Sequence, residues 1–284
     1  MTEKQGGSDL RGCTTQAQGL GGAEYALTGH KWFCSAPMSD AFLTLAQTDA
    51  GLTCFFLPRW RPDGSRNGLE FQRLKDKLGN HSNASSEVEF VGAWAHRVGD
   101  EGRGIATIMD MVHHTRLDCA VAAAGLMRQA VVQAVHHASH RRAFGKRLID
   151  HDLMARVLAD LALDVEAATL LAWRMAELCD AQVSDPRWGP LARLGVAVAK
   201  YWNNKRCPGV VVEAMECLGG AGYIEASLLP RLYREAPLNG IWEGSGNVIC
   251  LDVLRTLARE PDLPDLLRQE LGARVDPWLQ CASK

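Results

Sequence analysis

One glutamate of the sequence, Glu243, stands in a setting that suits proton chemistry. The segment Ile241–Asn247 places it between Trp242 and a Gly-Ser-Gly turn that opens a predicted helix. A desolvated carboxylate beside an apolar ring can act as a general base near neutral pH. The same carboxylate could instead complement the N-terminal end of the helix, which is worth about 0.3–1 kcal/mol. From this segment alone we favour the structural interpretation.

Two other segments have residue types that could bind a phosphate-bearing ligand. Leu218–Tyr223 ends a predicted helix with glycines, whose lack of a Cβ lets another molecule approach the backbone. Arg141–Lys146 combines basic side chains with Phe144, so it could grip a phosphate and cover an adenine. Ordinary helix ends explain both equally well, because a C-cap needs one glycine and basic residues suit a helix C-terminus.

Metal and disulfide chemistry are not indicated. His136 and His140 have the i, i+4 spacing of metal ligands, with His137 beside them, but no carboxylate or cysteine joins them on that helix face. We therefore predict exposed helix residues and no metal. The nine cysteines are odd in number and never form a Cys-x-x-Cys pair, which favours a reducing cytosol over a disulfide framework.

Length and charge restrict the class of protein further. The 284 residues exceed a typical single domain, and 47% hydrophobic with 23% charged residues is typical of a globular protein with a sizeable core. A net charge of −2 argues against nucleic-acid binding as the main activity. The chain has neither a signal-like N-terminus nor a membrane-length apolar run, so we predict a cytoplasmic protein without membrane contact.

The elements that must position these residues change type along the chain. Short runs rich in β-branched and aromatic residues predict antiparallel or mixed strands at 25–28, 42–47, 52–57, 69–74 and 86–91. Turn residues at Thr48–Gly51 and Arg61–Gly64 predict a hairpin and a second turn. From Gly104 the apolar residues recur three and four apart, which predicts long helices at about 105–139, 153–178, 191–218 and 247–258, with a kink at Pro208. Long helices of this kind pack as a bundle.

Taken together, the motifs resemble those of the acyl-CoA dehydrogenase family of flavoproteins over about residues 1–258. Thr2–Asp9 is similar to the family's Thr-Glu-x-x-x-Gly-Ser-Asp loop, and Leu27–Ser35 is similar to its Thr-Gly-x-Lys motif. Arg141–Gly145 is similar to its Arg-x-x-Phe-Gly motif. Leu218–Gly222 and Ile241–Ser245 are similar to its Leu-Gly-Gly-x-Gly and Ile-Tyr-Glu-Gly-Thr motifs. Lys75–Asn80, Leu232–Glu235 and Ile241–Asn247 most resemble the AidB-like branch, associated with the response to DNA alkylation.

The resemblance implies an α+β fold. An antiparallel β-barrel or sandwich, the family's middle domain, would occupy residues 1–100 and be followed by a four-helix bundle at 101–260. Residues 261–284 would form a tail with a short helix and an exposed end. The family's N-terminal helical domain has no counterpart in the sequence.

The resemblance also implies a FAD-dependent oxidoreductase that acts on acyl-CoA thioesters. Glu243 would remove the α-proton while the β-hydride passes to flavin N5. Some members carry the base at the position of Thr115, whose hydroxyl cannot serve, so Glu243 is the candidate. The implied cofactor contacts are Thr2, Phe33, Ser35, Arg141, Phe144, Gly219, Gly220, Gly222, Ser245 and Asn247, and Ser8 and Arg116 would lie near the substrate. A homo-oligomer, dimer or tetramer, would share its FAD sites between subunits.

The branch resemblance leaves an alternative open, a flavoprotein that binds or protects DNA and has little dehydrogenase activity. Its candidate contacts are the basic-aromatic stretch Lys200–Arg206 and the pair Arg231 and Arg234. A solvated helix face explains both equally well. A third reading is a sheet and bundle that bind nothing unaided. The electron acceptor and the acyl chain are not specified by any of these motifs.

Overall fold

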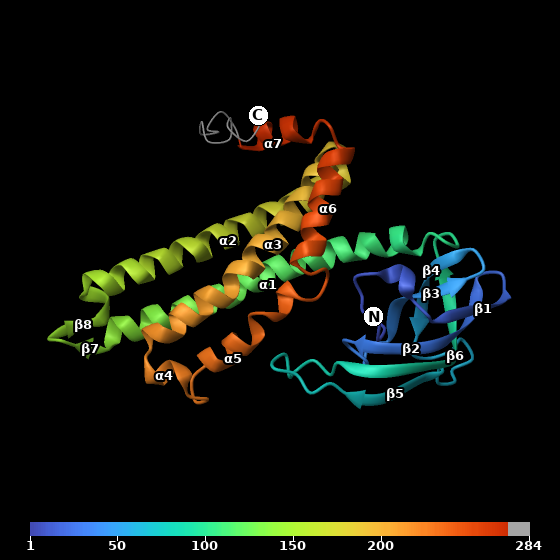
Figure 1. The fold of residues 1–284 in the computed structure, drawn as a ribbon, viewed down its shortest axis with the longest axis horizontal. Helices are drawn as coiled ribbons and strands as arrows, with labels where there is room; N and C mark the ends of the chain where they lie inside the picture. The colour runs from blue at the N-terminus through green and yellow to red at the C-terminus, as the bar shows by residue number, and fades with distance from the viewer. Residues whose placement is uncertain (272–284) are drawn as a thin grey trace. The chain divides into compact units, whose positions relative to one another are not determined.

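The computed structural model describes residues 1–271 of the chain. The chain divides into two compact units, Met1–Val112 and His113–Lys284. The first unit is rich in strands, and the second is helical (Figure 1). Within the described residues, no helix has the length and apolar character needed to cross a membrane.

The strands of the first unit form a sheet that closes on itself. They are β1 (Gln16–Gly21), β2 (Glu24–Cys34), β3 (Ala41–Thr48), β4 (Gly51–Pro58), β5 (Leu69–Leu74) and β6 (Ser86–Val98), preceded by the 3-10 helix η1 (Leu10–Gly12). The order β2-β1-β3-β4-β6-β5 is completed by an additional β2–β6 pairing, which closes a small barrel. All pairings are antiparallel except one parallel pair between β1 and β3. The predicted antiparallel β-domain is thus confirmed.

Alternation of side chains builds the core of this barrel. Leu27 on β2, Phe55 on β4, and Val88 and Phe90 on β6 are at most 1% exposed and belong to one apolar cluster. Because successive side chains of a strand point to opposite faces, such residues fill the interior. Both predicted turns are confirmed: Thr48 pairs with Gly51 in the β3–β4 hairpin, and Gly64 N–H donates to the Arg61 carbonyl at 3.0 Å.

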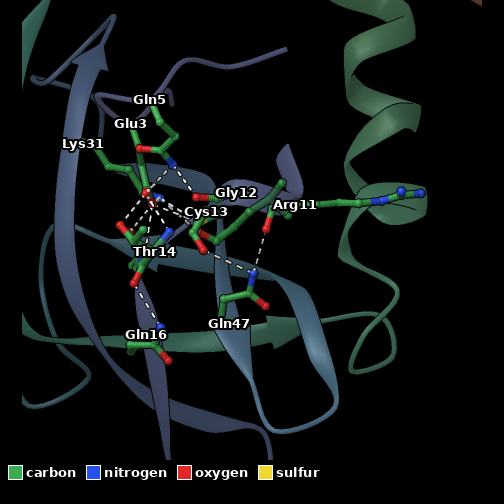
Figure 2. Close-up of polar contacts among 11 residues, drawn as sticks. Glu3, Gln5, Arg11, Gly12, Cys13, Thr14, Gln16, Lys31 and Gln47 are labelled. Carbon is green, nitrogen blue, oxygen red and sulfur yellow. Dashed lines mark hydrogen bonds and ion pairs between the residues drawn. The ribbon is translucent and has the colours of Figure 1, made fainter. Parts of the chain in front are cut away.

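A buried ion pair lies at the N-terminal end of this unit (Figure 2). Lys31 Nζ lies 2.7 Å from Glu3 Oε1, and the two side chains are 2% and 5% exposed. The same carboxylate accepts hydrogen bonds from Thr14, Thr15, Cys13 and Gln5. Burial alone would raise the pKa of Glu3, but hydrogen bonds from Cys13, Gln5, Lys31 and Thr15 outweigh it and hold the pKa well below its usual range. The ionised Glu3 therefore ties the N-terminal segment to β2.

The second unit is built of helices. They are α1 (Gly104–His140), which begins in the first unit, α2 (Asp152–Ser184), α3 (Gly189–Cys217), α4 (Gly220–Tyr223), α5 (Leu229–Glu235), α6 (Gly246–Arg259) and α7 (Leu263–Leu271). A hairpin of β7 (Arg142–Ala143) and β8 (Lys146–Arg147), followed by the 3-10 helix η2 (Leu148–Asp150), joins α1 to α2. The 3-10 helix η3 (Pro186–Trp188) precedes α3, and the 3-10 helix η4 (Leu238–Gly240) precedes the loop that leads into α6.

Small and flexible apolar residues let these helices pack closely. Ala123, Met127 and Ala134 on α1 are fully buried in one cluster with side chains of α2, α3 and α5. Figure 1 shows α1, α2 and α3 running side by side in this unit. Inside the bundle, Asn203 Nδ2 donates to the carbonyls of Ala120 and Ala168, so a buried amide links α3 to both neighbours. The predicted helical bundle is confirmed, and Pro208 lies inside α3.

The sequence prediction missed elements with weak patterns. Strand β1 reads Gln-Ala-Gln-Gly-Leu-Gly and is almost wholly exposed, so its sequence lacks the residue types and alternation of a strand. Its pairing with β2, and with β3 at one position, creates it. Helices α4 and α5 are 4 and 7 residues long, too short to show a period. The short helix predicted in the tail was not missed, because the structure has it as α7; residues 272–284 fall outside the described part.

Candidate functional site

The backbone at Glu243 is held in a conformation that few residues adopt. Glu243 lies between η4 and α6 with φ of 57°, and Gly244 follows with φ of 99°. A left-handed conformation in a residue other than glycine costs about 1–3 kcal/mol and persists only where surrounding contacts fix it. A Cβ at Gly244 would also lie 3.2 Å from Ile249 Cδ1 and 3.3 Å from an Arg116 guanidinium nitrogen, so a glycine is required there.

The carboxylate of Glu243 contacts helix α1. Thr115 Oγ1 donates to Glu243 Oε2 at 2.7 Å. One residue further along α1, the buried Arg116 donates from Nε to the Glu243 main-chain oxygen at 3.0 Å. One helix therefore orients both the side chain and the backbone of the candidate base. The predicted substrate residue Arg116 and the candidate base lie together, and Thr115 supplies a hydrogen bond to the acid.

Helix α3 contributes a second cation, Lys200, which is 1% exposed. Its Nζ donates to the carbonyl of Trp242 at 2.8 Å and also to that of Gly244. Burial lowers the pKa of Lys200 to about 8. The neighbouring thiol of Cys119 has its pKa raised to about 11, again because of burial. These shifts mark the surroundings of the site as strongly desolvated.

Asp252 on α6 completes the ionic network. Arg116 Nη1 lies 2.7 Å from Asp252 Oδ2, and Arg193 of α3 lies 3.0 Å from Asp252 Oδ1. Burial on its own would raise the pKa of Asp252, but the hydrogen bond from Arg193 and the charges of Arg116 and Arg193 outweigh it and lower the pKa. Asp252 therefore stays ionised and orients the guanidinium that contacts Glu243.

We expect the ion pairs of Asp252 to make the stability of the helical unit sensitive to acid. Because the pKa of Asp252 is lower in the folded state, its stabilisation is present above the unfolded value near pH 4 and is lost as pH falls below it. Asp252→Asn should reduce this loss of unfolding free energy at low pH by about 1–2 kcal/mol. Urea unfolding followed by far-UV circular dichroism between about pH 2.5 and 5 measures it. Equal pH slopes in both proteins would contradict the role of Asp252.

The predicted cofactor residues of the helical unit lie on exposed turns. Gly219 has φ of 58°, and a Cβ added at Gly219 or Gly220 would meet nothing within 4 Å, whereas Gly222 is packed against the Met215 carbonyl. Phe144, at the tip of the β7–β8 hairpin, is 95% exposed with φ of 49°. Figure 1 shows this hairpin and α4 at the same end of the helical unit. These turns leave backbone and ring surface open to a ligand.

Three other predicted cofactor residues border these features. Arg141 directly follows α1, and its N–H donates to the His137 carbonyl at 2.8 Å. Ser245 is the N-cap residue of α6, and its side chain makes no capping hydrogen bond. Asn247 is exposed in the first turn of the same helix. Ser245 and Asn247 therefore follow Glu243 closely at the start of α6, while Arg141 directly precedes the hairpin that carries Phe144.

In the first unit the structure brings two predicted contacts together. Thr2 pairs with Phe33 through an isolated bridge, in which Thr2 N–H donates to the Phe33 carbonyl at 3.2 Å and Phe33 N–H donates back at 3.1 Å. Phe33 is 43% exposed, and Lys75 Nζ lies 4.8 Å from its ring centroid. Ser35 follows β2 and is exposed, as is Ser8 in the N-terminal segment.

The stretch Lys200–Arg206 differs from its sequence prediction. Lys200, Asn203 and Asn204 are buried in the helical unit, so the stretch is neither a solvated face nor a continuous basic surface. Arg206 is bound to Asp164 on α2, and Arg234 to Glu225. The physical reason is that α3 packs on several sides, which the weak periodicity of its sequence did not reveal.

His136 and His140 interact within helix α1. His140 Nδ1 lies 2.8 Å from the His136 carbonyl, and the two ring centroids lie 4.5 Å apart with the ring planes tilted by 36°. Within residues 1–271, no group of three or more His, Cys, Asp or Glu side chains is placed to hold a metal ion.

Sequence reasoning missed Lys200 and Asp252 as parts of this site. Each had a signal, because Lys200 follows the apolar run Val196–Ala199 and Asp252 is surrounded by apolar residues of α6. A charge embedded in an apolar helical stretch indicates a buried partner. The partner itself, the main chain around Glu243 or the guanidinium of Arg116, could not be read from spacing.

Family comparison agrees with this architecture. Residues 1–93 match the family profile described as acyl-CoA dehydrogenase, middle domain, and residues 102–258 match that of acyl-CoA dehydrogenase, C-terminal domain. AidB of Escherichia coli, which bears the name acyl-CoA dehydrogenase, is 52% identical over 269 residues, 95% of this chain and 50% of that protein. Acyl-CoA dehydrogenase family member 11 of Caenorhabditis elegans is 38% identical over 293 residues, 98% of this chain and 47% of that protein.

Solved structures of acyl-CoA dehydrogenases also resemble the fold of this chain. The crystal structure of Caenorhabditis elegans ACDH-11 in complex with C11-CoA has a TM-score of 0.86 at 38% identity, covering 91% of this chain and 46% of that one. Butyryl-CoA dehydrogenase from Megasphaera elsdenii has a TM-score of 0.81 at 28% identity, covering 91% and 67%. This chain spans about half the length of the two relatives named above.

Proposed function

Because this chain belongs to the acyl-CoA dehydrogenase family, we propose that it is a FAD-dependent oxidoreductase of acyl-CoA thioesters in which Glu243 is the general base. The observation that carries the proposal is the geometry of Glu243. Its carboxylate is oriented by Thr115, and its left-handed backbone is held by two cationic side chains. Such a costly arrangement is typical of a functional residue.

The proposed role of Glu243 is to take the proton from the carbon next to the thioester carbonyl. Thr115 holds Oε2, which leaves Oε1 to accept the proton. When bound, FAD supplies the hydride acceptor that no side chain provides. The surrounding desolvation favours the transfer, because charges and dipoles act more strongly where water is excluded.

The residues present fit a flavin nucleotide. The open backbone at Gly219 and Gly220 admits close approach, and the exposed Phe144 ring offers a stacking surface on the hairpin that follows Arg141. Ser245 has an uncommitted hydroxyl at the N-terminus of α6, where main-chain N–H groups favour an anion. In the sheet unit, Thr2, Phe33 and Ser35 form a second group of proposed contacts.

The exposure of Phe144 also supports a proposed homo-oligomer. The Phe144 side chain is 95% exposed on a left-handed backbone, and within the chain its ring meets that of His151 edge-on at 6.1 Å. We therefore propose that the hairpin serves a FAD site shared with a second copy. Gly222 packs against the Met215 carbonyl and would support the shape of the glycine-rich turn at Gly219–Gly222. Ser8 and Arg116 remain proposed substrate-side residues.

The decisive experiment is the visible absorbance spectrum of the purified chain before and after anaerobic addition of an acyl-CoA. We expect a bound-flavin spectrum that bleaches when the thioester is oxidised. Acyl-CoA esters of several chain lengths should be compared, so that the preferred acyl chain is found in the same experiment. A flavin that no acyl-CoA bleaches would contradict the dehydrogenase proposal, and a chain that binds no FAD would contradict the cofactor proposal.

A further inference from the structure

We propose that Lys200 is a positioning residue that fixes the conformation of Glu243 by binding the carbonyls on either side of it. This inference rests on the proposed function of Glu243 as a base. Lys200 Nζ donates to the carbonyls of Trp242 and Gly244, while Arg116 Nε donates to the carbonyl of Glu243 itself. All three successive carbonyls of segment 242–244 thus accept hydrogen bonds from cationic side chains.

The geometry explains why a cation is needed there. In segment 242–244 the chain takes the left-handed conformation at Glu243 and Gly244, so these carbonyls are not used in a regular helix. Buried carbonyls without donors cost free energy, and donors that carry a charge form stronger hydrogen bonds than neutral ones. The ammonium group has three donors on one atom, so it can bridge two carbonyls at once.

The position of Lys200 within α3 makes its hold rigid. Asn204, one turn further along α3, is buried and donates from Nδ2 to the Lys200 carbonyl at 2.7 Å and to the Cys119 carbonyl at 3.3 Å. Helix α3 is therefore bonded to α1 just beside the lysine. Because Thr115 and Arg116 also lie on α1, the carboxylate and the backbone of Glu243 are fixed against one common frame.

The role of Lys200 is indirect. Its Nζ contacts main-chain oxygens, not the Glu243 carboxylate, which is held by Thr115. Removing the ammonium should release segment 242–244 and let the carboxylate leave its position. A displacement of about 1 Å at a reacting group can reduce a rate about a hundredfold. We therefore expect the rate of proton abstraction to fall without a matching loss of acyl-CoA affinity.

The first test is amide hydrogen exchange of the chain, measured by mass spectrometry in Lys200→Met. We expect the peptide covering residues 238–250 to exchange on the order of ten- to a hundredfold faster, since two charged hydrogen bonds are lost. Arg206→Met is the matched control, because it removes one positive charge from the same helix but pairs with Asp164 on α2. Unchanged exchange of this peptide in Lys200→Met would overturn the inference.

The second test is the anaerobic bleaching rate of the flavin-loaded protein. Lys200→Met should bleach about ten- to a hundredfold more slowly with the affinity for acyl-CoA unchanged, and Lys200→Gln, which keeps an N–H donor, should lie in between. Lys200→Gln also replaces Lys200→Met if the latter does not fold. A wild-type rate in a variant whose segment exchanges faster would overturn the positioning role.

The two tests separate this inference from the proposed function. If the wild-type protein binds FAD but no acyl-CoA bleaches it, the proposed function fails. Hydrogen exchange still decides whether Lys200 fixes the conformation of Glu243. If the wild type bleaches and both Lys200 variants behave as the wild type in both measurements, only the inference about Lys200 fails.

Discussion

Glu243→Gln is expected to slow the bleaching of bound flavin by an acyl-CoA by about 10²–10⁴-fold while FAD content and affinity for the thioester stay the same. The amide has the shape of the carboxylate and can still accept the hydrogen bond that Thr115 donates. The contacts of Arg116 and Lys200 are made to main-chain oxygens, so they survive the substitution. The substitution removes the negative charge and, with it, the capacity to accept a proton.

The measurement is stopped-flow absorbance under anaerobic conditions, with flavin content checked beforehand. Glu213→Gln is a suitable control, since it makes the same chemical change at an exposed position of α3 and should bleach at the wild-type rate. Bleaching at the wild-type rate in Glu243→Gln would mean that another group takes the proton. Thr115 could not be that group, because a hydroxyl is far too weak a base at neutral pH.

Glu3→Gln is expected to lower the unfolding free energy of the sheet unit by about 3–5 kcal/mol, because it leaves the ammonium of Lys31 buried without a charged partner. Besides Glu3, the Lys31 ammonium has one close oxygen acceptor, the Leu45 carbonyl at 3.0 Å, whereas the Glu3 carboxylate has further donors in Thr14 and Thr15. Lys31→Met should therefore be less damaging than Glu3→Gln.

Urea unfolding with amide hydrogen exchange of β2 and β3 as the local probe measures this effect. The exposed pair Asp40 and Arg59 is the control, and Asp40→Asn should change stability by less than about 1 kcal/mol. The double variant Glu3→Gln with Lys31→Met should recover part of the loss, because no charge then stays buried alone. Additive losses in the double variant would show that the two side chains do not stabilise each other.

The Glu3 cluster also bears on cofactor binding. Thr2 is next to Glu3 in the chain and is bonded to Phe33 on β2, so release of Glu3 should loosen both proposed flavin contacts. We therefore expect Glu3→Gln to bind FAD with lower affinity while the circular dichroism of the helical unit is unchanged. Destabilisation of the sheet and loss of the cofactor would then have one cause.

Much of the fold was determined by the sequence itself. Strands β3, β4 and β5 and helices α1 to α3 follow from local periodicity, because a buried strand face or helix stripe repeats at the period of its own backbone. The turns at Thr48–Gly51 and Arg61–Gly64 follow from residue types that suit tight turns. Glu243 was found in the same way, through a carboxylate between an aromatic residue and a glycine-rich helix start.

What holds the site together was decided by tertiary structure. Lys200 belongs by sequence to a basic-aromatic stretch, yet it is buried against carbonyls that follow it by more than forty residues. Thr115 lies 128 residues before the carboxylate that it orients. Strand β1 exists because β2 offers it a partner. Local patterns record which face of an element is apolar, but not which distant oxygen a buried ammonium or hydroxyl will meet, because that depends on how the helices pack.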